Sequence, residues 1–198
     1  HPSESLVLII AYLSYVAKHN TAETLDEMLD TDEYMDEAVK CIVKKELTDA
    51  LWQQIVNVTG KYEPDVFKHI VLTPNAANVG IPSKLDDMTT PDSIIALTNA
   101  IANIQPGNAI ADIGCGEGSY LITTAMEYPE ASFFGYEINS MARAIAAIRA
   151  SLVESSVAVT QCNAFTLLED DASGMLPEKK FDFIFSNYPF AMRLRNYV

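Results

Sequence analysis

The stretch Ala109-Ile-Ala-Asp-Ile-Gly-Cys-Gly-Glu-Gly118 decides the fold of this 198-residue chain. Its apolar first half predicts a buried strand with Asp112 near its end. Its second half places glycines at alternate positions, Gly114, Gly116 and Gly118. Glycines there let the backbone turn sharply into a helix and let a ligand approach it closely. The spacing is one residue tighter than the dinucleotide fingerprint, and Glu117 would repel a pyrophosphate. The stretch therefore predicts a site for a nucleoside without phosphates.

The segments around this turn alternate between strand and helix patterns. Further strands are predicted at Ser132–Tyr136, Val157–Gln161 and Phe181–Phe185, and helices are predicted from Pro91 to Pro106, over Ser119–Glu127, and along the stripe Met141, Ile145, Ile148 and Leu152. Strands that alternate with helices are typical of a parallel sheet with right-handed crossovers. We therefore expect an α/β fold with a partial doubly wound parallel sheet.

The first 80 residues have helical patterns instead. We expect a helix that closes at His19-Asn20, a capping box of Thr24 and Glu27, one long helical pattern from Thr31 to Gly60, and a short helix at Pro64. Residues 73–84 read as a linker or surface loop. The predicted division is a helical N-terminal domain over residues 1–84 and a second domain over 85–198.

The composition limits the classes of function. The chain has 13 basic and 27 acidic residues, a net charge of −14, and 49% hydrophobic residues, which excludes disorder. The charge divides into −6 for residues 1–84 and −8 for residues 85–198, so neither half is expected to hold DNA well alone. The acidic cluster from Asp26 to Glu37 lacks the glycine of a calcium loop, so no metal is expected there. We interpret it as a solvated face, and second as a docking surface for a basic partner.

Cysteine usage and hydropathy bear on location. The three cysteines lack metal-ligand spacing and are interpreted as reduced thiols of a cytoplasmic protein. The apolar run from Leu6 to Ala17 is too short to cross a bilayer, so no membrane partner is expected. Because the chain begins at His1, we interpret it as a piece of a longer protein.

Two further segments end at polar residues suited to ligand binding. Glu137 ends the second predicted strand, where a carboxylate can accept hydrogen bonds from both hydroxyls of a ribose. The last predicted strand stops at Asn187, which places an amide at the carboxyl end of the sheet. Pro189 holds Tyr188 extended and fixes its carbonyl, and Phe190 adds an aromatic face. Together these groups suit a planar ligand that carries an amino group.

Residues 85–198 resemble the class I S-adenosylmethionine-dependent methyltransferases, a Rossmann-like family. The resemblance is to the DNA adenine-N6 branch, and in particular to the modification subunit of type I restriction-modification systems. It rests on Asp112–Gly118 as the cofactor loop, on Glu137 as the ribose-binding acid, and on Asn187-Tyr-Pro-Phe190 as the (Asp/Asn/Ser)-Pro-Pro-(Tyr/Phe) motif. The sheet of that family has seven strands and four are counted here, so a domain truncated after the catalytic motif is expected.

The resemblance implies a set of site residues. The cofactor S-adenosylmethionine would be bound by Thr90, Pro91, Asp112, Gly114, Gly116, Gly118, Glu137, Ile138 and Asn163, and the catalytic residues would be Asn187, Tyr188, Pro189 and Phe190. Two positions depart from the family pattern. Tyr188 stands where the first proline of the motif is usual, and Asn163 stands where an aspartate usually holds the adenine amine.

The implied function is transfer of a methyl group to the N6 amine of adenine in DNA. The target base would be flipped into the site, where Asn187 and the Tyr188 carbonyl accept from its amine and Phe190 stacks on it. The implied partners are DNA, held through missing segments or a specificity subunit, and a restriction subunit. Two alternatives stay open: a class I methyltransferase acting on RNA or a protein glutamine, and a decayed, partner-binding module marked by Tyr188.

Overall fold

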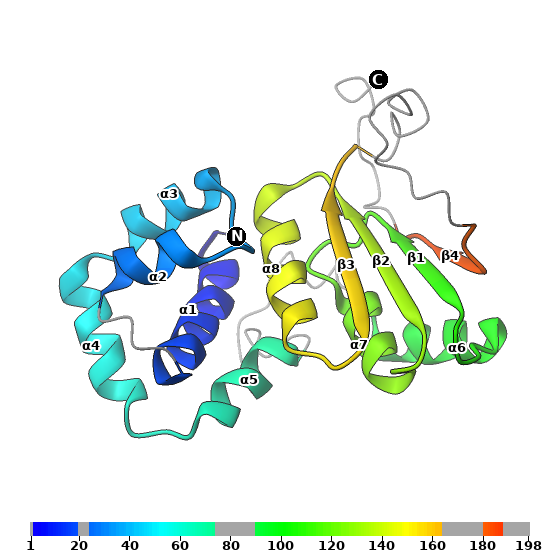
Figure 1. Ribbon diagram of the computed structural model, residues 1–198, viewed down its shortest axis with the longest axis horizontal. Helices are drawn as coiled ribbons and strands as arrows, with labels where there is room; N and C mark the ends of the chain where they lie inside the picture. Colours follow the sequence, from blue (N-terminus) through cyan, green and yellow to red (C-terminus); the bar gives the residue numbers. More distant parts are fainter. Residues whose placement is uncertain (1, 20–23, 74–89, 164–179, 188–198) are drawn as a thin grey trace. The chain divides into compact units, whose positions relative to one another are not determined.

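The computed structural model describes residues 2–19, 24–73, 90–163 and 180–187 (Figure 1). The chain divides into two compact units, His1–Asp86 and Asp87–Val198, and each is described here by itself. The boundary expected at residue 84 and the linker over 73–84 fall almost entirely outside the described residues. Both stay predictions.

The N-terminal unit is helical, as predicted. Its helices are α1 (Pro2–His19), α2 (Leu25–Thr31), α3 (Glu37–Glu46), α4 (Asp49–Thr59) and α5 (Pro64–Leu72) (Figure 1). α1 packs along α5, and the most deeply buried side chains of the unit include Leu13, Leu29 and Trp52. The capping box is confirmed: the Thr24 hydroxyl accepts from the Glu27 N–H, and the Glu27 carboxylate accepts from the Thr24 N–H.

The long helical pattern from Thr31 to Gly60 is wrong as a single helix. α2 ends at Thr31, and the Asp32 carboxylate accepts from the backbone N–H groups of Tyr34 and Met35 at 2.9 and 2.8 Å. A short polar side chain that bonds to the backbone ahead of it competes with helix formation. Asp36 then caps α3, which ends this first interruption of the helical pattern, and one further interruption follows at Leu47 and Thr48, where Thr48 caps α4.

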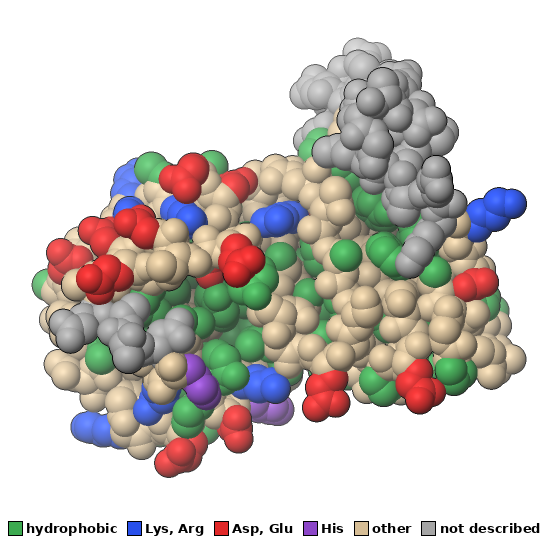
Figure 2. Space-filling view, viewed as in Figure 1, with side chains coloured by type: hydrophobic (Ala, Val, Ile, Leu, Met, Phe, Trp, Pro, Cys, Tyr) green, Lys and Arg blue, Asp and Glu red, His purple; other side chains and the backbone are tan. Residues whose placement is uncertain are grey.

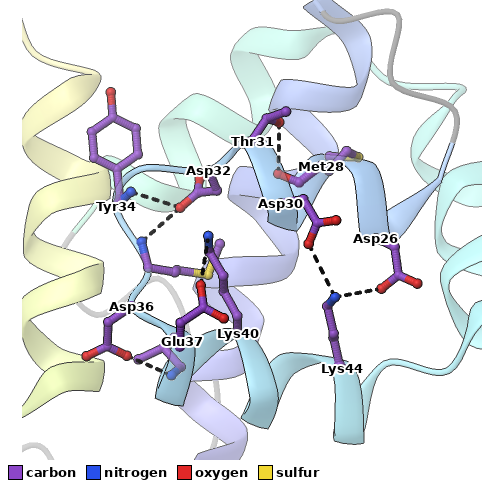
Figure 3. Close-up of polar contacts among 12 residues, drawn as sticks. Asp26, Met28, Asp30, Thr31, Asp32, Tyr34, Asp36, Glu37, Lys40 and Lys44 are labelled. Atoms are coloured by element: carbon purple, nitrogen blue, oxygen red, sulfur yellow. Dashed lines mark hydrogen bonds and ion pairs between the residues drawn. The ribbon is translucent and has the colours of Figure 1, made fainter.

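The acidic cluster of this unit is largely exposed to solvent, and two of its side chains form ion pairs between helices. Asp26 and Asp30 on α2 reach Lys44 on α3, with N–O distances of 3.0 and 3.5 Å (Figure 3). Acidic side chains gather on the visible face of the unit (Figure 2). Among the described residues, no group of His, Cys, Asp and Glu could hold a metal ion. Within those same residues, no helix is long and apolar enough to span a bilayer.

The second unit contains a parallel sheet. Its strands are β1 (Ala109–Ile113), β2 (Ser132–Glu137), β3 (Ser156–Gln161) and β4 (Phe183–Phe185), in the order β3-β2-β1-β4 (Figure 1). Asp112 of β1 lies opposite Gly135 of β2 and Phe185 of β4. The α/β class and the partial doubly wound parallel sheet are therefore confirmed.

Three helices connect and support these strands. They are α6 (Asp92–Ala102), α7 (Ser119–Glu127) and α8 (Ser140–Ser151). The main core cluster joins Ile95 of α6, Leu121 of α7 and Phe133 of β2. α6 ends before the Pro106 expected from the sequence, because Asn103 adopts a left-handed conformation with φ 49°. A Cβ at Gly135 would lie only 2.8 Å from the Leu121 side chain, so α7 packs tightly on β2.

Candidate active site

The turn between β1 and α7, here called the glycine loop (Gly114–Gly118), has the backbone conformation that its sequence predicts. Its glycines all have positive φ, with Gly114 at 75°, Gly116 at 56° and Gly118 at 84°. A Cβ at Gly116 would have no atom within 4 Å, so this position faces open space. A Cβ at Gly118 would lie 3.3 Å from the Ala146 side chain. Gly118 therefore permits close packing on α8, whereas Gly116 leaves room for a ligand.

Glu137 lies beside this loop at the end of β2. Its carboxylate oxygens each accept one backbone N–H at 2.8 Å, Oε2 from Gly116 and Oε1 from Asn139. The residue is only 9% exposed. A carboxylate oxygen has two lone-pair sites, so each oxygen can accept one further hydrogen bond. The two backbone bonds fix the carboxylate while leaving it able to accept from a pair of hydroxyls.

Asp112 is the second carboxylate of the site. It is 2% exposed in β1, and this burial, together with the nearby charge of Glu137, raises its pKa to about 7. The Cys115 thiol, between two glycines of the loop, is also buried, and its pKa is raised by that burial and by the same two carboxylates. Cys115 is 7% exposed and packs in the core against β2, where a Cβ at Gly135 would lie only 2.9 Å from its Sγ.

Sequence reasoning did not identify Arg149 as a residue that supports the site. It lies in α8, is 3% exposed, and donates from Nη1 to the Glu117 carbonyl of the glycine loop at 2.8 Å. Burial lowers its pKa, and the charge of Glu117 opposes that change. An arginine in the last turn of a mainly apolar helix was the available signal. Asn139 was missed as well: it caps α8 by accepting from the Ala142 N–H, as its position before that helix indicates.

Asn187 follows β4 at the same edge of the sheet as the glycine loop. Its exposed amide donates from Nδ2 to the hydroxyl oxygen of Thr90 at 3.3 Å. The preceding residue, Ser186, donates to the Ile113 carbonyl at 2.9 Å, and Phe185 stacks on Tyr120 of α7 with ring centroids 3.8 Å apart. These contacts fix the end of β4 against β1 and the first turn of α7.

The remaining predicted residues are placed as follows. Thr90 is buried, Pro91 is the N-cap of α6, and Ile138 is 43% exposed after β2. Asn163 lies two residues beyond β3 and is half-buried. Tyr188, Pro189 and Phe190 lie outside the described residues, so the second half of the predicted catalytic motif stays a prediction. The described residues that the structure brings together are Thr90 with Asn187, and Asp112 and Glu137 with the glycine loop.

A family model described as N-6 DNA Methylase matches residues 70–197 of the chain. The match covers the glycine loop, Glu137 and the whole predicted catalytic motif. A search of curated proteins finds no match.

Two solved structures are similar to the chain. A putative class I S-adenosylmethionine-dependent methyltransferase from Listeria monocytogenes has a TM-score of 0.51 and 15% identity, over 96% of this chain and 60% of its own. Precorrin-6y C5,15-methyltransferase from Geobacter metallireducens GS-15 has a TM-score of 0.44 and 23% identity, over 57% of this chain and 56% of its own. The first likeness shows a shared fold. The chain spans less than two thirds of the length of either neighbour.

Proposed function

Because the chain belongs to the N-6 DNA methylase family, we propose that it transfers the methyl group of S-adenosylmethionine to the N6 amine of adenine in DNA. The observation that carries the proposal is the pairing of β1 with β4. Asp112 lies opposite Phe185, so the Asn187 amide and the glycine loop lie at the same edge of the sheet. In open α/β sheets, ligands bind outside the carboxyl ends of the strands. An amide acceptor there can meet a substrate amine next to a bound cofactor.

The residues at this edge fit the nucleoside part of S-adenosylmethionine. Gly116 faces open space and permits a close approach to the backbone. Glu137 retains one accepting site on each oxygen, which suits the two hydroxyls of a ribose. Asp112 adds a second carboxyl group, and a ligand with positive charge would favour its ionised form. When bound, the cofactor supplies a methyl group activated by a sulfonium, and the family uses this methyl donor.

The chemistry proposed for the chain is mainly positioning. Asn187 Oδ1 accepts a hydrogen bond from the target amine, and the Tyr188 carbonyl accepts a second. These bonds direct the nitrogen lone pair away from the ring and toward the methyl group. Phe190 stacks on the base. No strong general base is required, because methyl transfer makes the amine nitrogen cationic and this nitrogen then releases its proton to water. Correct placement supplies most of the rate.

The charge of the chain defines what DNA binding would need. Residues 85–198, which include the site, have a net charge of −8, and Arg149 is buried and donates to the glycine loop. Phosphate contacts usually need Lys or Arg. We therefore assign most of the contact with DNA to a more basic specificity subunit or to further segments, and we include a restriction subunit among the expected partners.

The direct test is transfer of a tritiated methyl group by the full-length protein, with its specificity subunit supplied. Unmethylated DNA, RNA and protein would be offered separately, and the DNA would be digested to nucleosides. We expect label in N6-methyladenine. The Asn187→Ala variant should bind S-adenosylmethionine in calorimetry but transfer no methyl group, because it loses the acceptor and keeps the glycine loop and Glu137.

Each contrary result would indicate a different function for the protein. Label in RNA or in glutamine side chains, with none in DNA, would overturn the DNA substrate and keep the methyltransferase. Cofactor binding without transfer to any acceptor would instead indicate a decayed, partner-binding module.

A further inference from the structure

A buried arginine of α8, Arg149, contacts the backbone of the glycine loop. Arg149 is 3% exposed, and its Nη1 donates to the Glu117 carbonyl at 2.8 Å. The Cβ of Ala146, one turn earlier on the same helix, lies 3.3 Å from where a Cβ at Gly118 would stand. The end of the glycine loop therefore rests on one face of α8, and Arg149 supplies a polar contact there.

The start of the glycine loop is held by the end of β2 instead. The N–H groups of Gly114 and Cys115 donate to the Tyr136 carbonyl at 2.9 and 3.1 Å. The next N–H, of Gly116, donates to the Glu137 carboxylate at 2.8 Å. These bonds from β2 hold the first half of the loop, whereas α8 contacts the second half.

The second half of the loop needs an anchor because its backbone is permissive. Glu117 lies between Gly116 and Gly118, which have φ of 56° and 84°. Glycine populates many backbone conformations, so a segment with two glycines loses much conformational entropy when it is fixed. A loop that is fixed before its ligand arrives binds more tightly than one that is ordered only on binding. The bond to the Glu117 carbonyl restrains the peptide group between Glu117 and Gly118.

The burial of Arg149 is costly, and the geometry indicates what it serves. A cation in the last turn of a helix usually interacts with the carbonyls at the end of its own helix. Nη1 of Arg149 instead donates to a carbonyl 32 positions earlier, outside α8. An apolar side chain of similar volume could fill this place without the cost of removing a charge from water. A buried guanidinium here therefore indicates a polar task toward the loop.

We propose that Arg149 is a positioning residue that holds the glycine loop, through the Glu117 carbonyl, in the conformation that accepts S-adenosylmethionine. The guanidinium acts through the loop backbone, so its loss should weaken cofactor binding while every residue expected to touch the cofactor is still present. This inference rests on the proposed function, because it concerns the same site, but it predicts cofactor affinity rather than the choice of substrate.

The binding test compares Arg149→Met with Arg149→Lys in the full-length protein, by calorimetry with S-adenosylmethionine. Methionine has an unbranched stem without a donor, whereas lysine keeps a cationic donor. We expect the Kd to rise about tenfold in Arg149→Met and by less than about threefold in Arg149→Lys. A wild-type Kd in Arg149→Met, or an equal loss in both variants, would overturn the inference.

A matched control separates loop positioning from loss of stability. Ile148→Val changes the neighbouring buried residue of α8 and lowers stability without removing the bond to the loop. Unfolding raises an apparent Kd only by the inverse of the folded fraction, so a variant that is more than half folded by circular dichroism shows a rise of less than about twofold. We expect the Kd of Ile148→Val to stay within that limit. A tenfold rise in this control would overturn the inference, because destabilisation of α8 would then explain both results.

Hydrogen exchange of the glycine loop gives a readout that needs neither cofactor nor substrate. The Gly116 N–H donates to the Glu137 carboxylate, and the Gly118 N–H donates to a carbonyl within the loop. Exchange of these two amides therefore reports opening of the loop. We expect it to accelerate in Arg149→Met and to stay near the wild-type rate in Arg149→Lys, with the amides of α1 as an internal reference. Unchanged exchange in Arg149→Met would overturn the inference.

The outcomes separate this inference from the proposed function. If the protein binds S-adenosylmethionine but methylates RNA, protein or nothing at all, the DNA proposal fails, while the Kd values and the exchange rates still decide the role of Arg149. If DNA is methylated at N6 of adenine and Arg149→Met binds the cofactor with the wild-type Kd, the inference alone fails.

Discussion

The N-terminal unit (His1–Asp86) and the second unit (Asp87–Val198), here called the methylase unit, each have a net charge of −7, but their carboxylates lie in different surroundings. In the N-terminal unit, Asp26 and Asp30 are mostly exposed and pair with Lys44. In the methylase unit, Asp112 and Glu137 are buried, and each raises the cost of ionising its neighbours. The same residue types form exposed ion pairs between helices in one unit and lie beside the glycine loop, at the proposed cofactor site, in the other. Net charge alone therefore says little about where function lies.

The largest expected effect comes from Glu137→Gln. The amide nitrogen of glutamine would face a backbone N–H, of either Gly116 or Asn139, and could no longer accept from a ribose hydroxyl. Hydrogen bonds to a charged group are the strong ones, so we expect the Kd for S-adenosylmethionine to rise by more than about 100-fold. Calorimetry measures it. Asp26→Asn makes the same chemical change at an exposed acid and should leave the Kd unchanged. Wild-type affinity in Glu137→Gln would mean that the buried Glu137 contributes no more to cofactor binding than the exposed Asp26 does.

The pH dependence of stability is the next effect in size. The pKa of Asp112 is about 7 in the folded protein against an ordinary value of 3.8, so the folded state holds a proton that the unfolded state releases. The free energy of unfolding should therefore decrease as the pH rises from about 4 to about 7, and should level off above pH 7. Between pH 5 and pH 8, Asp112 alone should lower this free energy by about 3 kcal/mol. Urea unfolding at a series of pH values measures it.

Two variants sharpen this test. Asp112→Asn should flatten that decrease, because the amide does not titrate. Asp30→Asn, which changes an exposed acid of the N-terminal unit, should leave the decrease in the free energy of unfolding intact. An unchanged slope in Asp112→Asn would mean that Asp112 is already ionised in the folded protein at pH 5.

Local sequence signals predicted much of this architecture. The capping box of Thr24 and Glu27 and the helix over Ser119–Glu127 follow from contacts between residues a few positions apart, and both are confirmed. The glycine loop was predictable for the same reason, because positive φ is a property of single residues. The breaks at Asp32 and Thr48 were missed because an apolar stripe continues across them, while the capping side chains interrupt the helix.

Contacts between distant segments could not be predicted in the same way. Nothing near Glu137 in the sequence indicates that its carboxylate accepts from Gly116, 21 positions earlier. The bond of Arg149 to the Glu117 carbonyl and that of Asn187 to Thr90 depend equally on how the helices pack on the sheet. The sequence was enough to name residues of the proposed site, but the hydrogen-bond partners that orient them could be identified only in the folded structure.

A helix cap provides the third and smaller effect. Asp36 accepts from the Val39 N–H at 2.8 Å as the N-cap of α3. Asp36→Ala should lower the free energy of unfolding of the N-terminal unit by about 1 kcal/mol. Asp36→Asn should retain most of that stability, because asparagine is an equally good cap. Cofactor affinity should be unchanged in both variants, as expected if this acid has only a structural role.

The smallest effect is expected at Lys44, which contacts both Asp26 and Asp30 (Figure 3). The pKa of Lys44 is raised, mainly by its hydrogen bond to Asp26. Exposed ion pairs contribute little, because water and salt screen them and two flexible side chains must be ordered. Thermal unfolding of Lys44→Met should show a Tm within about 1 °C of the wild type at low salt, with no difference at high salt. A large, salt-independent loss would instead show that the exposed acids of the N-terminal unit depend on their partner as strongly as the buried carboxylates of the methylase unit depend on theirs.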